Sequence, residues 1–341
     1  MLNINMLPAD EQQNLRDIFS GKALPSLCSD VIAKRILNAD VHPDRLNFLM
    51  RSIAKDPTID VAASAGNESF RQSLLAKSMI FDIPSWLKDR RLADLEMQKT
   101  KQEFIFTRIE LYASNMLLLQ YSVSQGQAKS ELDYSNVRDA LIIVLMVESP
   151  KEFRDYDDIC ERYIHRFTRM IADTGLSYPI RAKMIYVQLD KCLNQYKEGR
   201  NAEAADGRPD ELQLWLSMFA DVNDEMVKKA ADKDEDLVKI MKEASDMAQE
   251  KEVQNMLLQE DFVRMDWATH RHQARDEGRN EGFNDGRIEG LAEGEIQGTI
   301  KTYYRMGKRP SEIIGLIESD LHLDHNAAEK YVEETLGAQI S

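Results

Sequence analysis

The sequence has few cysteines and no long apolar run. Its three cysteines, Cys28, Cys160 and Cys192, are scattered over 341 residues. An odd number of dispersed cysteines argues against a disulfide framework or a zinc knuckle and is typical of a reducing compartment. The longest apolar run covers residues 140–147. It is much shorter than the roughly 18 residues that a membrane-spanning helix needs, so we expect no membrane partner.

Several functional signals are also missing. Residues 1–10 have neither the basic start nor the apolar stretch of a secretion signal, and we therefore expect a cytoplasmic protein. No glycine-rich phosphate loop follows a strand pattern, and no Ser-His-Asp or Cys-His arrangement is recognisable. These absences argue against a nucleotide-binding fold of the common types and against an enzyme with a serine or cysteine nucleophile.

The net charge of −15 is unevenly distributed along the chain. Residues 201–300 contain 12 Lys and Arg against 25 Asp and Glu and carry most of the negative excess. Residues 71–120 instead contain eight basic against six acidic side chains. A phosphate backbone could approach this locally basic segment, even though the whole chain is acidic.

Hydrophobic periodicity predicts a mixed α/β core with one sheet over residues 24–200, after an N-terminal arm, residues 1–23, that we expect to be mobile. The expected helices cover residues 29–37, 46–53 and 104–121. The expected strands cover residues 78–83, 92–98, 140–147, 163–167 and 184–189, with Pro84 ending the first and a turn at 86–90.

The C-terminal part is predicted to be helical throughout. It divides into a helical region over 208–270, a Glu-Gly repeat over 271–298 and a small helical unit over 299–341. Pro310 and Asp324 suit the first turn and the N-cap of two helices in this last unit.

The Glu-Gly repeat places glycine at every fourth position from Gly278 to Gly298, with an acidic residue before each of the first five. Each glycine destabilises a helix by about 1 kcal/mol relative to alanine, so an isolated helix would be weak. Close packing of a partner helix on the glycine row could offset this cost. We therefore leave two interpretations open: a helix for homo-oligomer or partner contacts, or a flexible spacer.

Three polar residues on the two predicted strands suggest a metal site. Asp82 ends the first strand, and Glu96 and Gln98 lie on one face of the second because side chains alternate along a strand. Mg²⁺ prefers oxygen ligands and commonly uses one or two protein carboxylates with water and substrate phosphate. The alternative is that Glu96 and Gln98 face solvent on an edge strand.

Several short motifs, taken in their order along the chain, resemble the PD-(D/E)xK nuclease superfamily. Within it they are similar to the bacterial recombination-promoting nuclease and transposase group. The matching segments are Ser29–Lys34, Ser78–Ile83, Leu95–Gln98, the Arg108 and Tyr112 pair, Leu119–Gln120, Leu141–Val144 and the Glu-Gly repeats. The likeness covers most of residues 24–192 and then 270–335. It implies a restriction-endonuclease-like αβββαβ core with a mixed sheet, followed by the helical C-terminal region.

The resemblance also implies roles for individual residues. Asp82 and Glu96 match the metal-binding acids for Mg²⁺ or Mn²⁺, and Gln98 stands where the superfamily usually has lysine. The chain departs from the family pattern at Ala33, where an aromatic residue is usual, and in residues 84–90, which lack the usual glycine. Five further residues are candidates to support the site or contact DNA: Asp30, Lys34, Lys101, Arg108 and Tyr112. For Asp30 a helix-capping role is the alternative, and for the Arg108 and Tyr112 pair it is packing between helix and sheet.

The leading hypothesis is a Mg²⁺-dependent DNA endonuclease linked to recombination or transposition. A second is a catalytically inactive DNA-binding or scaffold protein that keeps the fold, which the neutral Gln98 and the acidic tail favour. A third is a helical interaction protein in which residues 24–192 form no separate core.

Overall fold

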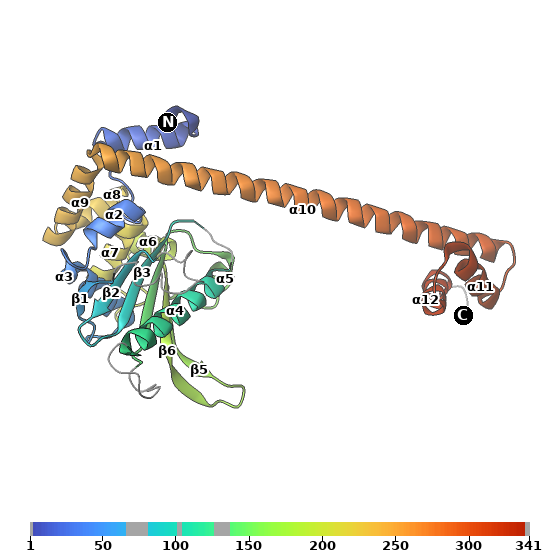
Figure 1. Ribbon diagram of the computed structural model, residues 1–341. Coiled ribbons are helices and arrows are strands. Elements are labelled where there is room, and N and C mark those ends of the chain that lie inside the picture. Colours follow the sequence, from blue (N-terminus) through green and yellow to red (C-terminus); the bar gives the residue numbers. More distant parts are fainter. Residues whose placement is uncertain (1–2, 66–80, 101–103, 126–136, 338–341) are drawn as a thin grey trace. The chain divides into compact units, whose positions relative to one another are not determined.

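The computed structural model describes residues 3–65, 81–100, 104–125 and 137–337 (Figure 1). It divides into two compact units, Met1–Phe262 and Val263–Ser341. The long helix α10 (Lys251–Arg305) begins in the first unit and ends in the second. Within the described part of the chain, no helix has the length and apolarity needed to cross a membrane.

The first unit opens with helices. A short 3-10 helix η1 (Ile4–Met6) precedes α1 (Ala9–Phe19), α2 (Asp30–Ile36) and α3 (Pro43–Ala54). The prediction of a mobile arm over residues 1–23 did not include α1, whose Leu15 and Ile18 are buried. Only these two positions of α1 are buried, and so short an apolar pattern is easily interpreted as a polar segment.

Six strands form one mixed sheet in the order β1-β2-β3-β4-β6-β5 (Figure 1). The strands are β1 (Val61–Ser64), β2 (Ile83–Leu87), β3 (Leu92–Gln98), β4 (Ala140–Met146), β5 (Ile164–Ile171) and β6 (Ser177–Gln188). Strand β4 pairs in parallel with β3 and β6, and the other neighbours are antiparallel. With α3 before β1 and α4 (Ile105–Gln125) between β3 and β4, the element order is αβββαβ, which confirms the predicted core.

The core is built around β4, which is buried on both faces as its continuous apolar sequence predicts. Ile142, Val144 and Met146 share one face and belong to a cluster with Ile109 and Met116 of α4. The α4 helix crosses this side of the sheet (Figure 1). The residues of β4 between them are equally buried and point to the opposite face, where α6 (Leu189–Lys197) contacts the strand.

The structure corrects the prediction for the first hairpin. Strand β2 starts at Ile83, contains Pro84 and continues to Leu87, so the predictions that Pro84 ends a strand and that a turn begins at residue 86 are wrong. Residues 78–80 lie outside the described residues. The side chain of Asp82 accepts a hydrogen bond from the backbone of Met97 in β3, and the regular ladder begins only one residue later. Pro84 has no N–H to donate, but its carbonyl accepts a hydrogen bond from the backbone N–H of Ala65.

The two later predicted strands exist but are longer, since β5 and β6 form an extended hairpin. Beyond α5 (Lys151–Arg154) and α6, the rest of the first unit is helical: α7 (Glu211–Ala220), α8 (Glu225–Ala231) and α9 (Glu235–Ala248). Aspartates accept hydrogen bonds from the first-turn N–H groups of α7, α8 and α9, which fixes where each helix begins.

The second unit contains the end of α10, α11 (Pro310–Leu321) and α12 (His325–Leu336). As predicted, Pro310 lies in the first turn of α11 and Asp324 caps α12. Seven residues form its core: Ile296, Ile300, Ile313, Ile317, Ala328, Val332 and Leu336. The Glu-Gly repeat falls within α10. Around the glycines from Gly286 to Gly298, a Cβ atom would meet no other atom within 4 Å.

Candidate functional site

Strand β3 carries three polar side chains on one buried face. Asp94, Glu96 and Gln98 are 0 %, 4 % and 2 % exposed, and the strand is paired on both sides. The prediction of a solvent-facing edge strand is therefore wrong. Their register partners in β4 face α4, so the three polar groups lie between the sheet and that helix. Burying such groups is unfavourable unless they are paired.

Asp82 joins this row from the neighbouring chain segment. Its Oδ2 accepts a hydrogen bond of 2.7 Å from the backbone N–H of Met97. Continuing the register beyond the Ile83–Leu95 pair brings Asp82 opposite Glu96. The structure thus brings together the two carboxylates that the sequence analysis proposed as metal ligands. Asp82 precedes β2, whereas we had placed it at the end of a strand.

Arg108 reaches into the row from α4. Its Nη2 donates to Glu96 Oε1 at 2.6 Å and to Gln98 Oε1 at 2.9 Å. The other end of the Gln98 amide donates to the backbone carbonyl of Thr100 at 2.7 Å. Both ends of Gln98 are therefore held, and its carbonyl oxygen shares the Arg108 Nη2 donor with Glu96.

Tyr112 lies one helical turn beyond Arg108 and supports it. The guanidinium carbon is 5.5 Å from the centre of the Tyr112 ring, a cation–π arrangement. The same ring packs against Phe81 with a centroid distance of 4.8 Å. Of the two roles left open for this pair, Arg108 contacts the row directly and Tyr112 packs behind it.

Helix α2 contributes two further charges. Lys34 Nζ is 3.9 Å from Asp82 Oδ1, and the negative charge of Asp30 acts on both Asp82 and Glu96. Asp30 is the first residue of the helix, and no side-chain cap bond is made by its N-cap residue Ser29. The capping role considered for Asp30 belongs to another residue.

That residue is Glu260 of α10. Its carboxylate accepts hydrogen bonds from the Ser29 hydroxyl, the Val31 backbone N–H and the ammonium group of Lys99, the last at 2.6 Å. Glu260 thus holds the start of α2 and binds Lys99, the residue that directly follows β3. Lys101 lies outside the described residues.

The carboxylates raise one another's pKa. Burial, and then the charge of Asp30, raises the pKa of Asp82 to about 6. Burial and the charge of Asp82 raise that of Asp94 to about 8. The pKa of Glu96 is raised well above its usual value by burial and by both aspartates, against the opposing charge of Arg108. Burial and mutual repulsion therefore oppose ionisation of these carboxyl groups when no cation is bound.

Two oxygens in this site have no hydrogen-bond partner. Asp94 Oδ2 and Glu96 Oε2 are buried and unpaired among the described residues. Each such atom is unfavourable by about 1–3 kcal/mol. A bound cation or a proton would relieve both the missing bond and the crowding of charge.

The donor chemistry fits Mg²⁺ or Mn²⁺, which take oxygen ligands. In the described ranges, no cluster of three or more His, Cys, Asp and Glu residues is arranged to hold a metal ion. Two carboxylates, Asp82 and Glu96, are nevertheless enough for a hard divalent cation that completes its shell with water and phosphate.

The sequence analysis did not identify two residues of this site, Asp94 and Glu260. Asp94 follows the same alternation as Glu96 and Gln98, and that spacing was a usable signal. Glu260 lies more than 200 residues after Ser29, and no local pattern connects the two.

Comparisons with curated proteins and with solved structures found no match. One family model matches residues 29–274, a range that contains the whole sheet, α4, α2 and Glu260. The order of its elements and the acidic row on β3 agree with that match. On this evidence, the chain belongs to the PD-(D/E)XK nuclease family transposase group.

Proposed function

We propose that the protein is a divalent-metal-dependent DNA endonuclease that hydrolyses phosphodiester bonds in recombination or transposition. The main support is the convergence of Asp82 and Glu96 on the buried face of β3, with Glu96 Oε2 left unpaired. Membership of a transposase family implies DNA as the partner.

Asp82 and Glu96 would hold the metal ion, and Gln98 would offer its carbonyl oxygen beside them. A divalent ion supplies Lewis-acid polarisation of the phosphate and a more acidic bound water. The raised pKa values of the two carboxylates fit this role, because a cation removes the crowding that raises them.

Lys34 and Arg108 would provide the positive charge that Gln98 lacks. Lys34 lies beside Asp82 with its side chain 38 % exposed, so its ammonium group could also meet a phosphate oxygen. Arg108 orients Glu96 and Gln98 through the same Nη2 atom. In this scheme Arg108 is a positioning residue, and Tyr112 and Glu260 support the elements that carry the site.

The second candidate is a DNA-binding or scaffold protein without cleavage activity. It is favoured by the bonds of Arg108, since one guanidinium already engages both Glu96 and Gln98. In either case the open glycine row of α10 could serve a second copy of the chain, a homo-oligomer contact that we retain as a proposal.

Cleavage of supercoiled plasmid tests the proposal. We expect nicking or linearisation with Mg²⁺ or Mn²⁺, none with EDTA, and none for Asp82→Asn, which keeps the size of the side chain. Asp173→Ala is the control, because Asp173 is an exposed carboxylate in the β5–β6 turn. Equal cutting by all proteins would reject the mechanism, and metal-independent DNA binding without cutting would select the second candidate.

A further inference from the structure

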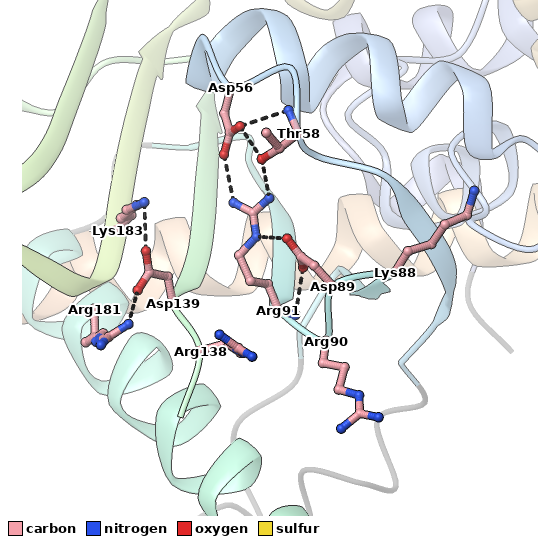
Figure 2. Close-up of a pocket in the computed structure, with 10 residues that line it drawn as sticks. All are labelled: Asp56, Thr58, Lys88, Asp89, Arg90, Arg91, Arg138, Asp139, Arg181 and Lys183. Atoms are coloured by element: carbon pink, nitrogen blue, oxygen red, sulfur yellow. Dashed lines mark hydrogen bonds and ion pairs between the residues drawn. The ribbon is translucent and has the colours of Figure 1, made fainter. Parts of the chain in front are cut away.

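A second site lies at the other end of the same strands. It is a cavity of about 620 Å³. The residues that line it are drawn in Figure 2: Asp56, Thr58, Lys88, Asp89, Arg90, Arg91, Arg138, Asp139, Arg181 and Lys183. These residues come from the loop before β1, the β2–β3 turn, the residues preceding β4, and β6. Arg91 precedes β3 whereas Glu96 is near its end, a separation of roughly 16 Å along an extended strand.

The lining of this cavity is basic in an otherwise acidic protein. Six Lys or Arg side chains face three carboxylates, an excess of three positive charges, while the whole chain has a net charge of −15. Burial opposes ionisation of Asp56 and Asp139, but hydrogen bonds outweigh it and lower the pKa of each. These bonds come from Thr58 and Arg91 to Asp56, and from Lys183 and Arg181 to Asp139. Asp56 and Asp139 are thus ionised at neutral pH, and the cations of the lining still outnumber its carboxylates.

Most of these cations already have partners that fix the wall. Arg91 donates to Asp56 and Asp89 at 2.7 Å each and to Thr58 at 2.9 Å. Both Arg181 and Lys183 pair with Asp139, at 3.0 and 2.8 Å. Lys88 pairs with Asp60, outside the cavity lining.

Arg90 and Arg138 are different. Both are exposed, and neither side chain has a hydrogen bond or ion pair with any of the described residues, as Figure 2 illustrates. Arg90 also has a φ of 71°, a left-handed conformation that is unfavourable for a residue with a Cβ. A strained backbone that keeps a free arginine at the mouth of a cavity points to a use for that charge.

The chemistry of the lining defines the ligand. Guanidinium groups bind phosphate oxygens through paired N–H donors. None of the described residues that line the cavity has an aromatic or aliphatic side chain, so these residues offer a nucleobase no aromatic stacking surface. A phosphate group, recognised without its base, satisfies both observations.

We propose that this cavity binds phosphates of a nucleic-acid backbone, at a position separate from the carboxylate site. The proposal rests on DNA being the partner, as in the proposed function, and does not depend on cleavage. Contacts of this kind would hold a flank of the DNA and contribute affinity without sequence preference.

Duplex binding in EDTA, where no metal-dependent cleavage occurs, tests the proposal. The double variant Arg90→Gly/Arg138→Ala is expected to bind a short fluorescein-labelled duplex at least about tenfold more weakly, with a salt dependence smaller in slope by about two. The loss should be the same for unrelated sequences. Arg16→Ala is the matched control, because Arg16 is an exposed arginine on α1, which contributes nothing to the cavity.

Two further measurements separate the alternatives. Arg90→Gly should not lower the melting temperature, since glycine suits the left-handed turn, so lost binding cannot be ascribed to unfolding. Titration with inorganic pyrophosphate identifies a free-phosphate site.

Unchanged duplex binding by the double variant overturns the proposal. If the double variant then loses only pyrophosphate binding, the cavity takes a small phosphate ligand. A wild-type protein that binds DNA but never cuts it would reject the nuclease function alone.

Discussion

Carboxylates occur near both ends of strand β3, and their pKa values move in opposite directions. Near the end of the strand, burial and mutual repulsion raise the pKa of Asp82 to about 6 and that of Asp94 to about 8. Before its start, hydrogen bonds from Thr58 and Arg91 outweigh burial and hold the pKa of Asp56 at about 2.

The difference lies in the cations supplied by the neighbouring elements. The acidic row has Arg108 and, at 3.9 Å, Lys34, whereas the basic cavity has six cations for three carboxylates. The same residue type therefore makes one end of the strand a candidate for a metal ion and the other a candidate for phosphate. Substitutions at each end should have opposite effects on stability and binding.

The largest effect is expected from Glu96→Gln. Loss of a metal-ligand charge should reduce plasmid cleavage by roughly 10²-fold or more. In EDTA the free energy of unfolding should change little. The neutral amide removes the charge whose ionisation burial and the two aspartates oppose, and its carbonyl oxygen can still accept the hydrogen bond from Arg108. Cleavage rates and urea denaturation measure the two quantities.

A binding measurement accompanies this variant. Mg²⁺ should raise the melting temperature of wild type by mass action, and Glu96→Gln should lose that shift. Asp173→Ala should behave as wild type, since its carboxylate is exposed on another hairpin. An active Glu96→Gln protein, or an unaltered Mg²⁺ shift, would remove Glu96 from the metal site.

The next effect is on the pH dependence of stability without metal. Asp94 has a pKa of about 8 in the folded protein, against the ordinary value of 3.8 that applies to the unfolded chain. Between these two pH values the folded state therefore binds more protons than the unfolded state. Its contribution to stability is fully present below pH 4 and is lost as the pH rises toward 8, by on the order of a few kcal/mol. Asp94→Asn should flatten this decline in urea denaturation from pH 5 to 8 in EDTA.

Asp56 should show the opposite sign. Its pKa is lowered to about 2, so its stabilising contribution is present above pH 4 and is lost as the pH falls through 2. Asp56→Asn breaks the 2.7 Å contact with the mostly buried Arg91 and should cost about 1–3 kcal/mol at pH 7. Asp89→Asn, at a half-exposed partner of the same arginine, should have a smaller effect. Equal effects would show that burial does not govern this network.

The two ends of β3 also differ in how well the sequence predicts them. Glu96, Gln98 and the β3 strand follow from alternation and from the family pattern, and the apolar run of β4 predicts a central strand. The cavity joins residues from positions 56 to 183, and no local periodicity relates them. The start of β2 was predicted wrongly for a similar reason. The Asp82 carboxylate accepts a hydrogen bond from the backbone of Met97, 15 residues later, and the pairing of β2 with β3 begins only after Asp82.

The smallest effect is expected from Arg90→Gly. The left-handed backbone at a φ of 71° is unfavourable for arginine by roughly 1–2 kcal/mol, and glycine removes that strain. The greater freedom of glycine in the unfolded chain offsets about 0.5–1 kcal/mol of the gain. The free energy of unfolding should therefore stay the same or rise by about 1 kcal/mol, as measured by urea denaturation at neutral pH. Arg90→Ala, which keeps the Cβ, should give no such gain. A clear loss of stability in the glycine variant would mean that the Arg90 side chain has a structural role. It would then not be free to bind a phosphate.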